Sequence, residues 1–214
     1  MEHEVSLEDR LWMVGKMFAM VERYFAHWED SRIRPDAWDD CYTACLAEAV
    51  RSSTRREFER MMQRLVAQLG NRHTWFRDTS NLRGDLGLRL RRLDGSWYVV
   101  RSAHAELRPG TAVVTLNGRT PEDWMEEASP YLRSRDERLR EEEWQRVIAA
   151  LVDDDLWILE FDDGLRRRTV TIRRTLPDSR KERPEGRWLV PDRVAYLRVP
   201  SFADPAYEEV PWRG

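Results

Sequence analysis

The sequence predicts an α+β protein in which a bundle of helices comes first and a smaller β-rich part follows. Between residues 6 and 78, apolar side chains recur at steps of three and four, the spacing of a helix face that packs on a core. From residue 86 onward, short apolar runs are separated by Asp-Gly and Asn-Gly pairs, which are typical of β-hairpin turns. We therefore expect a helical domain over 1–80, a small β domain with helices over 81–176, and a linker with one further strand over 177–214.

Three helices are expected in the first part. Ser6 stands where an N-cap would, before an apolar face that runs to Phe25. Pro35 suits the start of a second helix over 36–50, because its ring fixes φ at a helical value. A third helix, over 54–69, should face the core through Phe58, Met61, Met62, Leu65 and Leu69. Further core packing is expected from an aromatic cluster of Tyr24, Phe25 and Trp28.

Two helices and three hairpins are expected in the second part. Pro121 opens a short helix, and a charged helix over about 135–151 should turn a solvated face outward. Alternation and turn residues place the hairpins at 86–90 and 97–101 around Asp94-Gly95, at 111–116 before Asn117-Gly118, and at 156–161 and 166–174 around Asp163-Gly164.

Composition and charge exclude some classes of partner. The net charge is −3, and acidic residues lie among the basic ones throughout, so we expect no nucleic acid partner. No stretch approaches the ~20 apolar residues of a membrane helix, and the acidic start lacks the apolar segment of a secretory signal. We therefore expect no membrane partner and a cytoplasmic protein.

No metal or cofactor is expected. Cys41 and Cys45 lie one helical turn apart, which suits a disulfide poorly, and no histidine stands near enough to complete a metal site. We interpret them as buried thiols. The acidic run 153–155 matches no established cation loop, and we interpret it as a solvated turn.

Four motifs occur in a fixed order along the chain. They are Leu-Gly-Asn-Arg-His-Thr at 69–74, Gly-Asp-Leu-Gly-Leu at 84–88, Pro-Gly-Thr at 109–111 leading to Asn117-Gly118, and Val-Ala-Tyr-Leu-Arg-Val-Pro-Ser-Phe at 194–202. In this order they resemble the tail-specific, or C-terminal-processing, serine peptidases, including the tricorn core. The resemblance runs from about Leu11 to Phe202. It implies that 81–176 is a PDZ-like peptide-binding domain and that 177–214 is a linker with the first strand of a truncated catalytic domain.

The resemblance implies a groove that binds peptide or protein C-termini. In such a groove an extended peptide adds as a strand, and backbone N–H groups of a turn receive its terminal carboxylate. An ordinary glycine-containing hairpin is the alternative, and Pro-Gly-Thr at 109–111 departs from the Gly-Asp that the family commonly has there. The groove residues would be Gly84, Leu86, Gly87, Leu88 and Arg89, with Arg83 as a second source of positive charge.

The same resemblance makes His73 the candidate catalytic base. In tricorn-like members the histidine of this motif takes a proton from a serine on a later domain, whereas in the Ser–Lys branch it is structural. Asn71 stands where the family has Asp, so both roles remain open. We expect His73 to act only together with a serine-bearing domain.

No serine nucleophile is recognisable in the sequence. It has no Gly-x-Ser-x-Gly element and no Ser–Lys pair at a plausible spacing, and Ser201 belongs to a strand-end motif. We expect this chain to be the N-terminal portion of a tail-specific serine peptidase and to be inactive alone. The alternatives are a free-standing peptide-binding or regulatory module and a purely structural protein.

The apolar run 194–202 reads as a buried strand. Left unpaired it would invite association, so we expect it to dock on the chain's own sheet or to form a homo-oligomer. A complementing catalytic chain is the other partner that the resemblance implies.

Overall fold

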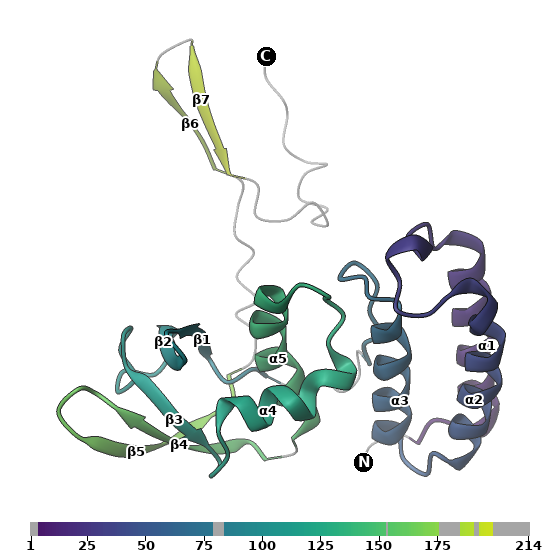
Figure 1. The fold of residues 1–214 in the computed structure, drawn as a ribbon, viewed down its shortest axis with the longest axis horizontal. Helices are drawn as coiled ribbons and strands as arrows, with labels where there is room; N and C mark the ends of the chain where they lie inside the picture. Colours follow the sequence, from purple (N-terminus) through teal and green to yellow (C-terminus); the bar gives the residue numbers. More distant parts are fainter. Residues whose placement is uncertain (1–3, 79–83, 153, 176–184, 191–192, 199–214) are drawn as a thin grey trace. The chain divides into compact units, whose positions relative to one another are not determined.

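The computed structural model describes residues 4–78, 84–152, 154–175, 185–190 and 193–198 (Figure 1). As predicted, these residues form an α+β fold with five α-helices and a five-stranded antiparallel sheet. The chain divides into two compact units, Met1–Leu176 and Pro177–Gly214. The expected boundary near residue 80 falls inside the first unit, which contains two separate hydrophobic cores.

The first core is helical. Helix α1 spans Leu7–Tyr24, α2 spans Trp38–Arg51 and α3 spans Arg55–Gln68, with short 3-10 turns at Trp28–Asp30 and Pro35–Ala37. Ser6 caps α1 as predicted, its Oγ accepting the N–H of Asp9 at 3.1 Å. Pro35 opens the 3-10 turn, so the second α-helix begins two residues later than expected.

Helix α3 supplies the largest share of this core. All five side chains predicted to face inward are buried, and the ring of Phe18 from α1 packs against Trp38 with centroids 4.2 Å apart. The prediction for Tyr24 was wrong. Its side chain is 71% exposed beside the Arg23 guanidinium, because it lies on the outer face of α1, and Phe25 and Trp28 take the inner positions. Cys41 and Cys45 are free thiols; Cys45 is buried and Cys41 half-buried.

The sheet follows the order of the sequence. Its strands are β1 (Leu88–Leu93), β2 (Ser96–Ser102), β3 (Ala112–Leu116), β4 (Leu156–Asp162) and β5 (Arg167–Arg173), so β1 and β5 are the edges. The hairpins at Asp94-Gly95 and Asp163-Gly164 are confirmed. The hairpin expected at Asn117-Gly118 was wrong. That turn closes only Leu116 on Arg119, and β3 pairs instead with β2 and β4.

The second core lies between this sheet and two helices, α4 (Pro121–Ala128) and α5 (Glu137–Leu151). Pro121 prevents a return strand after β3, because it begins α4. Trp97, Trp144 and Trp157 are fully buried, and the rings of Trp97 and Trp144 meet edge to face at 5.3 Å. Burying each such side chain stabilises the fold by about 1.5–3 kcal/mol.

Three arginines fasten the carboxyl end of α5. Arg56 and Arg60 of α3 both donate to the carbonyl oxygen of Leu151, and Arg174 donates to those of Ala149 and Val152. Carbonyl groups in the last turn of a helix lack helical partners and carry the negative end of its dipole, so they favour cations. The helical core and the sheet are thereby joined through one helix end.

The second unit contains two described strands. β6 (Glu185–Val190) pairs antiparallel with β7 (Val194–Arg198). Val194 and Tyr196 are 47% and 39% exposed, so the expectation of a buried strand was wrong for these two residues, because two paired strands alone bury little of their side chains. Val199, Ser201, Phe202 and most of the predicted linker lie outside the described residues.

The described part of the chain shows neither a membrane-spanning helix nor a cluster of metal ligands. None of its helices combines the length and apolar character that crossing a bilayer requires. No group of three or more potential metal ligands occurs within it; Asp154 and Asp155 are exposed, and Asp153 lies outside it.

The start of α3 generates a pH prediction. Glu57 accepts hydrogen bonds from the Ser53 N–H, the Ser53 hydroxyl and the Thr54 N–H, and the Thr54 hydroxyl oxygen accepts the Glu57 N–H. These bonds, led by that from the Ser53 N–H, lower the pKa of Glu57 below its ordinary value of 4.5. The stabilisation is therefore present above that ordinary pKa and is lost as pH falls through the lower pKa of the folded state.

We expect Glu57→Gln to remove this acid-sensitive contribution. Urea unfolding between about pH 6 and about pH 3 should show a smaller loss of stability for the variant than for the wild type. Glu126→Gln is the control, because Glu126 is an exposed carboxylate in α4. Parallel pH curves for all three proteins would contradict the role of Glu57.

Candidate functional site

The predicted groove residues lie at the start of β1. Gly84 is buried, Leu86 is buried in the second core, and Leu88 is half-buried against that core. Arg89 is exposed on β1, and Arg83 lies outside the described residues. The side chain of Leu86 thus packs in the core. The family resemblance implied instead that it would line an open pocket.

The turn before β1 uses much of its own hydrogen-bonding capacity. The Asp85 N–H donates to the Thr175 carbonyl at 2.9 Å, and the Gly87 N–H donates to Asp85 Oδ1 at 2.8 Å. The Leu86 carbonyl lies 2.8 Å from His104 Nε2. Within the described residues, the N–H of Leu86 has no acceptor. The predicted carboxylate site therefore presents fewer unpaired N–H groups than a fully open turn.

Helix α5 lies along the free edge of β1. The Leu90 N–H donates to Gln145 Oε1 at 2.7 Å, and Gln145 Nε2 donates to the Leu90 carbonyl at 3.0 Å. Glu142 contacts Arg89 at 3.3 Å and Arg91 at 3.9 Å. An edge strand with a helix beside it is the arrangement in which an extended peptide can add as a further strand. Sequence reasoning missed Gln145, because nothing in a helical pattern marks which polar residue meets a strand edge.

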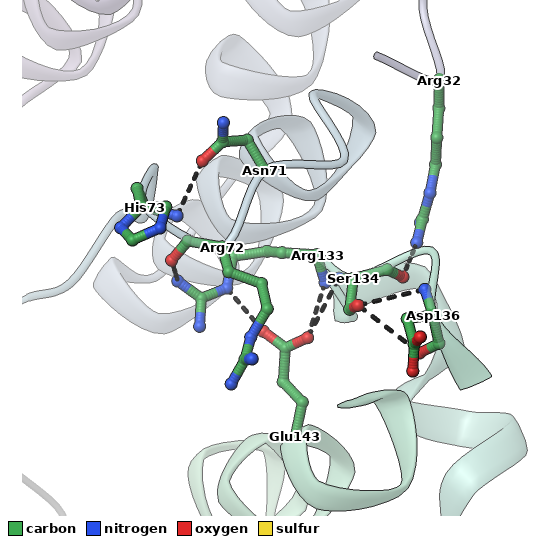
Figure 2. A network of polar contacts seen from close by, with 8 residues as sticks. All are labelled: Arg32, Asn71, Arg72, His73, Arg133, Ser134, Asp136 and Glu143. Atoms are coloured by element: carbon green, nitrogen blue, oxygen red, sulfur yellow. Dashed lines mark hydrogen bonds and ion pairs between the residues drawn. The ribbon is translucent and has the colours of Figure 1, made fainter. Parts of the chain in front are cut away.

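A second polar cluster surrounds Glu143, whose side chain is 4% exposed (Figure 2). Its carboxylate accepts the N–H groups of Arg133 and Ser134 at 3.0 and 3.2 Å, and the Nε of Arg133 at 2.6 Å. Arg32 reaches the same segment, donating to the Ser134 carbonyl at 2.6 Å. The prediction that the charges of this helix form a solvated face was wrong for Glu143.

His73 is linked to this cluster through the preceding residue, Arg72. Arg133 Nη1 donates to the Arg72 carbonyl at 3.1 Å, and the His73 N–H donates to Asn71 Oδ1 at 2.7 Å. Asn71 therefore shapes the turn that presents the histidine. The imidazole ring is exposed, and it has no hydrogen-bond partner among the described residues. Ser201 and the rest of the strand-end motif lie outside that part of the chain.

A cavity of about 710 Å³ lies away from both clusters. The loop at 105–111 and the β4–β5 hairpin line it, so it contains the Pro109-Gly110-Thr111 motif. Its charged residues are of both signs, and Arg168 is paired with Asp163 at 2.9 Å. The Pro109-Gly110-Thr111 motif thus lines a cavity that the sequence analysis did not predict.

Solved structures of CPAF share the fold of this chain. Mature CPAF complexed with lactacystin matches with a TM-score of 0.60 and 12% identity over 78% of this chain and 34% of that one. Mature CPAF gives 0.51 and 14% over the same shares. A serine-to-alanine mutant of CPAF gives 0.55 and 14% over 79% and 34%. The chain therefore spans about a third of the length of CPAF. No family profile and no curated protein matches it.

Gly87 is the residue of the turn that tolerates least change. Its φ is +63°, and an added Cβ would lie 3.0 Å from His104 Nε2 and 3.1 Å from Thr175 Oγ1. We expect Gly87→Ala to lower the free energy of unfolding by about 1–3 kcal/mol. Gly164→Ala is the matched control, with φ at +86° and open space around the new methyl. Urea unfolding should show the larger loss for Gly87→Ala; equal losses would mean that crowding contributes nothing.

Glu143 generates a second stability prediction. Glu143→Ala leaves two backbone N–H groups and the Arg133 guanidinium without their acceptor, so we expect a loss of about 2–4 kcal/mol. Glu126→Ala, which removes an exposed carboxylate, should change stability by less than about 0.5 kcal/mol. Chemical denaturation compares the two. A loss for Glu143→Ala no greater than for its control would contradict a structural role for the buried carboxylate.

Proposed function

We propose that this chain is the peptide-binding part of a serine protease of the tail-specific type. CPAF, with which the chain shares its fold, is a serine protease resembling that family. The observation that carries the proposal is the free edge of β1 beside α5. A polypeptide C-terminus would add there as a strand, in the manner of a PDZ-like domain, with its main chain paired to β1.

The residues at the start of β1 have distinct roles in this proposal. The Leu86 N–H would donate to a terminal carboxylate, and Gly87, with φ at +63°, would let the backbone turn there. Arg89 adds positive charge from the exposed face of the strand. Leu88 is half-buried at the strand start, where it can contact an apolar last side chain of the peptide.

In this proposal, hydrolysis requires a serine nucleophile in addition to the residues of the peptide-binding part. Peptide-bond cleavage by a serine enzyme needs an activated hydroxyl and a base within hydrogen-bond reach of it. The exposed ring of His73 is the proposed base, acting on a serine that another segment or a complementing chain supplies. We accordingly propose that this chain binds peptides and does not cleave them alone.

The test is a titration of the purified chain with fluorescein-labelled decapeptides that carry a free C-terminal carboxylate and an apolar last residue. Fluorescence anisotropy should show binding with a Kd of roughly 1–100 μM, a range typical of added-strand peptide recognition. The same peptides with amidated C-termini should bind at least about tenfold more weakly, because the carboxylate no longer engages the turn.

Mass spectrometry of the peptides after incubation tests the second half of the proposal, and intact peptides are expected. Equal binding of the acid and amide forms would contradict carboxylate recognition. Cleaved peptides would contradict the assignment of hydrolysis to another segment. The absence of any binding would favour a structural role for this part of the chain.

A further inference from the structure

The edge of β1 is already occupied at one position. Leu90 turns its N–H and its carbonyl away from β2, and both meet the side-chain amide of Gln145. The two distances, 2.7 and 3.0 Å, are those of ordinary backbone pairing in a sheet. One side chain therefore satisfies both backbone groups that Leu90 offers at the free edge.

A primary amide is suited to this task. It carries a carbonyl acceptor and an N–H donor on one planar group, as a peptide bond does. Gln145 Nε2 also donates to the Glu141 carbonyl of the same helix at 3.0 Å, which restrains the amide. Gln145 thus reproduces at Leu90 the pairing that one residue of an added strand would make.

The bound peptide and this side chain need the same two atoms. An antiparallel strand added to an edge exchanges both an N–H···O and an O···H–N bond with alternate residues of that edge. At Leu90 those groups are accessible to a peptide only after the Gln145 amide has left. The rotatable bonds of glutamine permit this while α5 stays in place, tied to β1 by Glu142 with Arg89 and Arg91.

We propose that Gln145 is an internal surrogate ligand, which closes the β1 edge in the unbound chain and competes with an incoming peptide. This inference rests on the proposed function, since it concerns regulation of the same groove. The same contact would keep this edge from pairing with other chains, because the Gln145 amide covers the outward N–H and carbonyl of Leu90 until a peptide displaces it.

The experiment compares three forms of the full 214-residue chain: wild type, Gln145→Met and Arg146→Met. Methionine matches the length of glutamine and favours a helix but cannot pair with Leu90. Arg146 lies next to Gln145 on α5 and is exposed, so it controls for the new side chain. Hydrogen exchange at the Leu90 amide, followed by NMR, reports directly whether the Gln145 side chain covers the Leu90 N–H. Titration with the labelled free-acid decapeptides reports its effect on binding.

We expect the Leu90 amide to exchange at least about fivefold faster in Gln145→Met than in wild type, because its acceptor is gone. The same variant should bind the decapeptides roughly five- to tenfold more tightly, since no internal bonds must break first. Arg146→Met should behave as wild type in both measurements. Gln145→Glu, which keeps the acceptor for the Leu90 N–H but loses the donor, should fall between wild type and Gln145→Met; it supplies the same test if Gln145→Met does not fold.

The outcomes separate this inference from the proposed function. Wild type and Gln145→Met binding the peptides equally well would overturn the surrogate-ligand role and leave peptide binding standing. Unchanged exchange at Leu90 would overturn it as well, since the amide would not be covering the edge. Binding by neither protein, with faster exchange at Leu90 in the variant, would overturn the proposed function and, with it, any competition for the groove.

Discussion

The hydrogen bonds that fix α5 are the constraint on which the rest of the first unit depends. In the middle of α5, the buried carboxylate of Glu143 accepts the backbone N–H groups of Arg133 and Ser134, which precede the helix. At its carboxyl end, the guanidinium groups of Arg56, Arg60 and Arg174 donate hydrogen bonds to its last carbonyl groups. The helix dipole favours cations at that end. Together with the Glu143 contacts, these bonds fix the position and orientation of α5.

Because α5 is fixed in this way, it packs in the second core, is bonded to the helical core and contacts the edge of β1. Trp144 and Ile148 pack under the sheet, while Arg56 and Arg60 tie the helical core to the last turn of α5. On its remaining side, Gln145 and Glu142 face β1. The spacing between helix and strand edge is therefore set by packing elsewhere, which is the kind of rigid support that a binding groove requires.

Much of the fold could be predicted from local sequence signals. The cap at Ser6 and the Asp-Gly turns act over three or four residues, so the sequence displays their chemistry directly. The Asn117-Gly118 turn misled, because the same local signal precedes either a return strand or a helix, and Pro121 selects the helix. Local signals thus predict turns better than they predict which strands pair.

The candidate site was harder to predict, because its contacts join residues far apart in the sequence. Glu143 looks like any other charge in an acidic helix until Arg133 and Ser134 are seen beside it. Gln145 meets Leu90 across 55 residues. The motif histidine was proposed from family resemblance. Asn71, which accepts its N–H, belongs to the same motif, whereas Arg133, which donates to the Arg72 carbonyl, belongs to none. Polar residues that act through single tertiary contacts, unlike the apolar residues of the core, leave no periodic trace in the sequence.

The paired bonds between Asp85 and Thr175 have a consequence for how this protein is assembled from parts. One residue precedes β1 and the other follows β5, and their backbone groups exchange hydrogen bonds at 2.9 Å in both directions. The chain thus enters and leaves the sheet-bearing part at a single point. A part with adjoining ends can be inserted into a host chain, or exchanged for another, without changing the separation between the flanking segments. In architectural terms, residues 86–174 form a cassette whose two ends are joined by one pair of residues, Asp85 and Thr175.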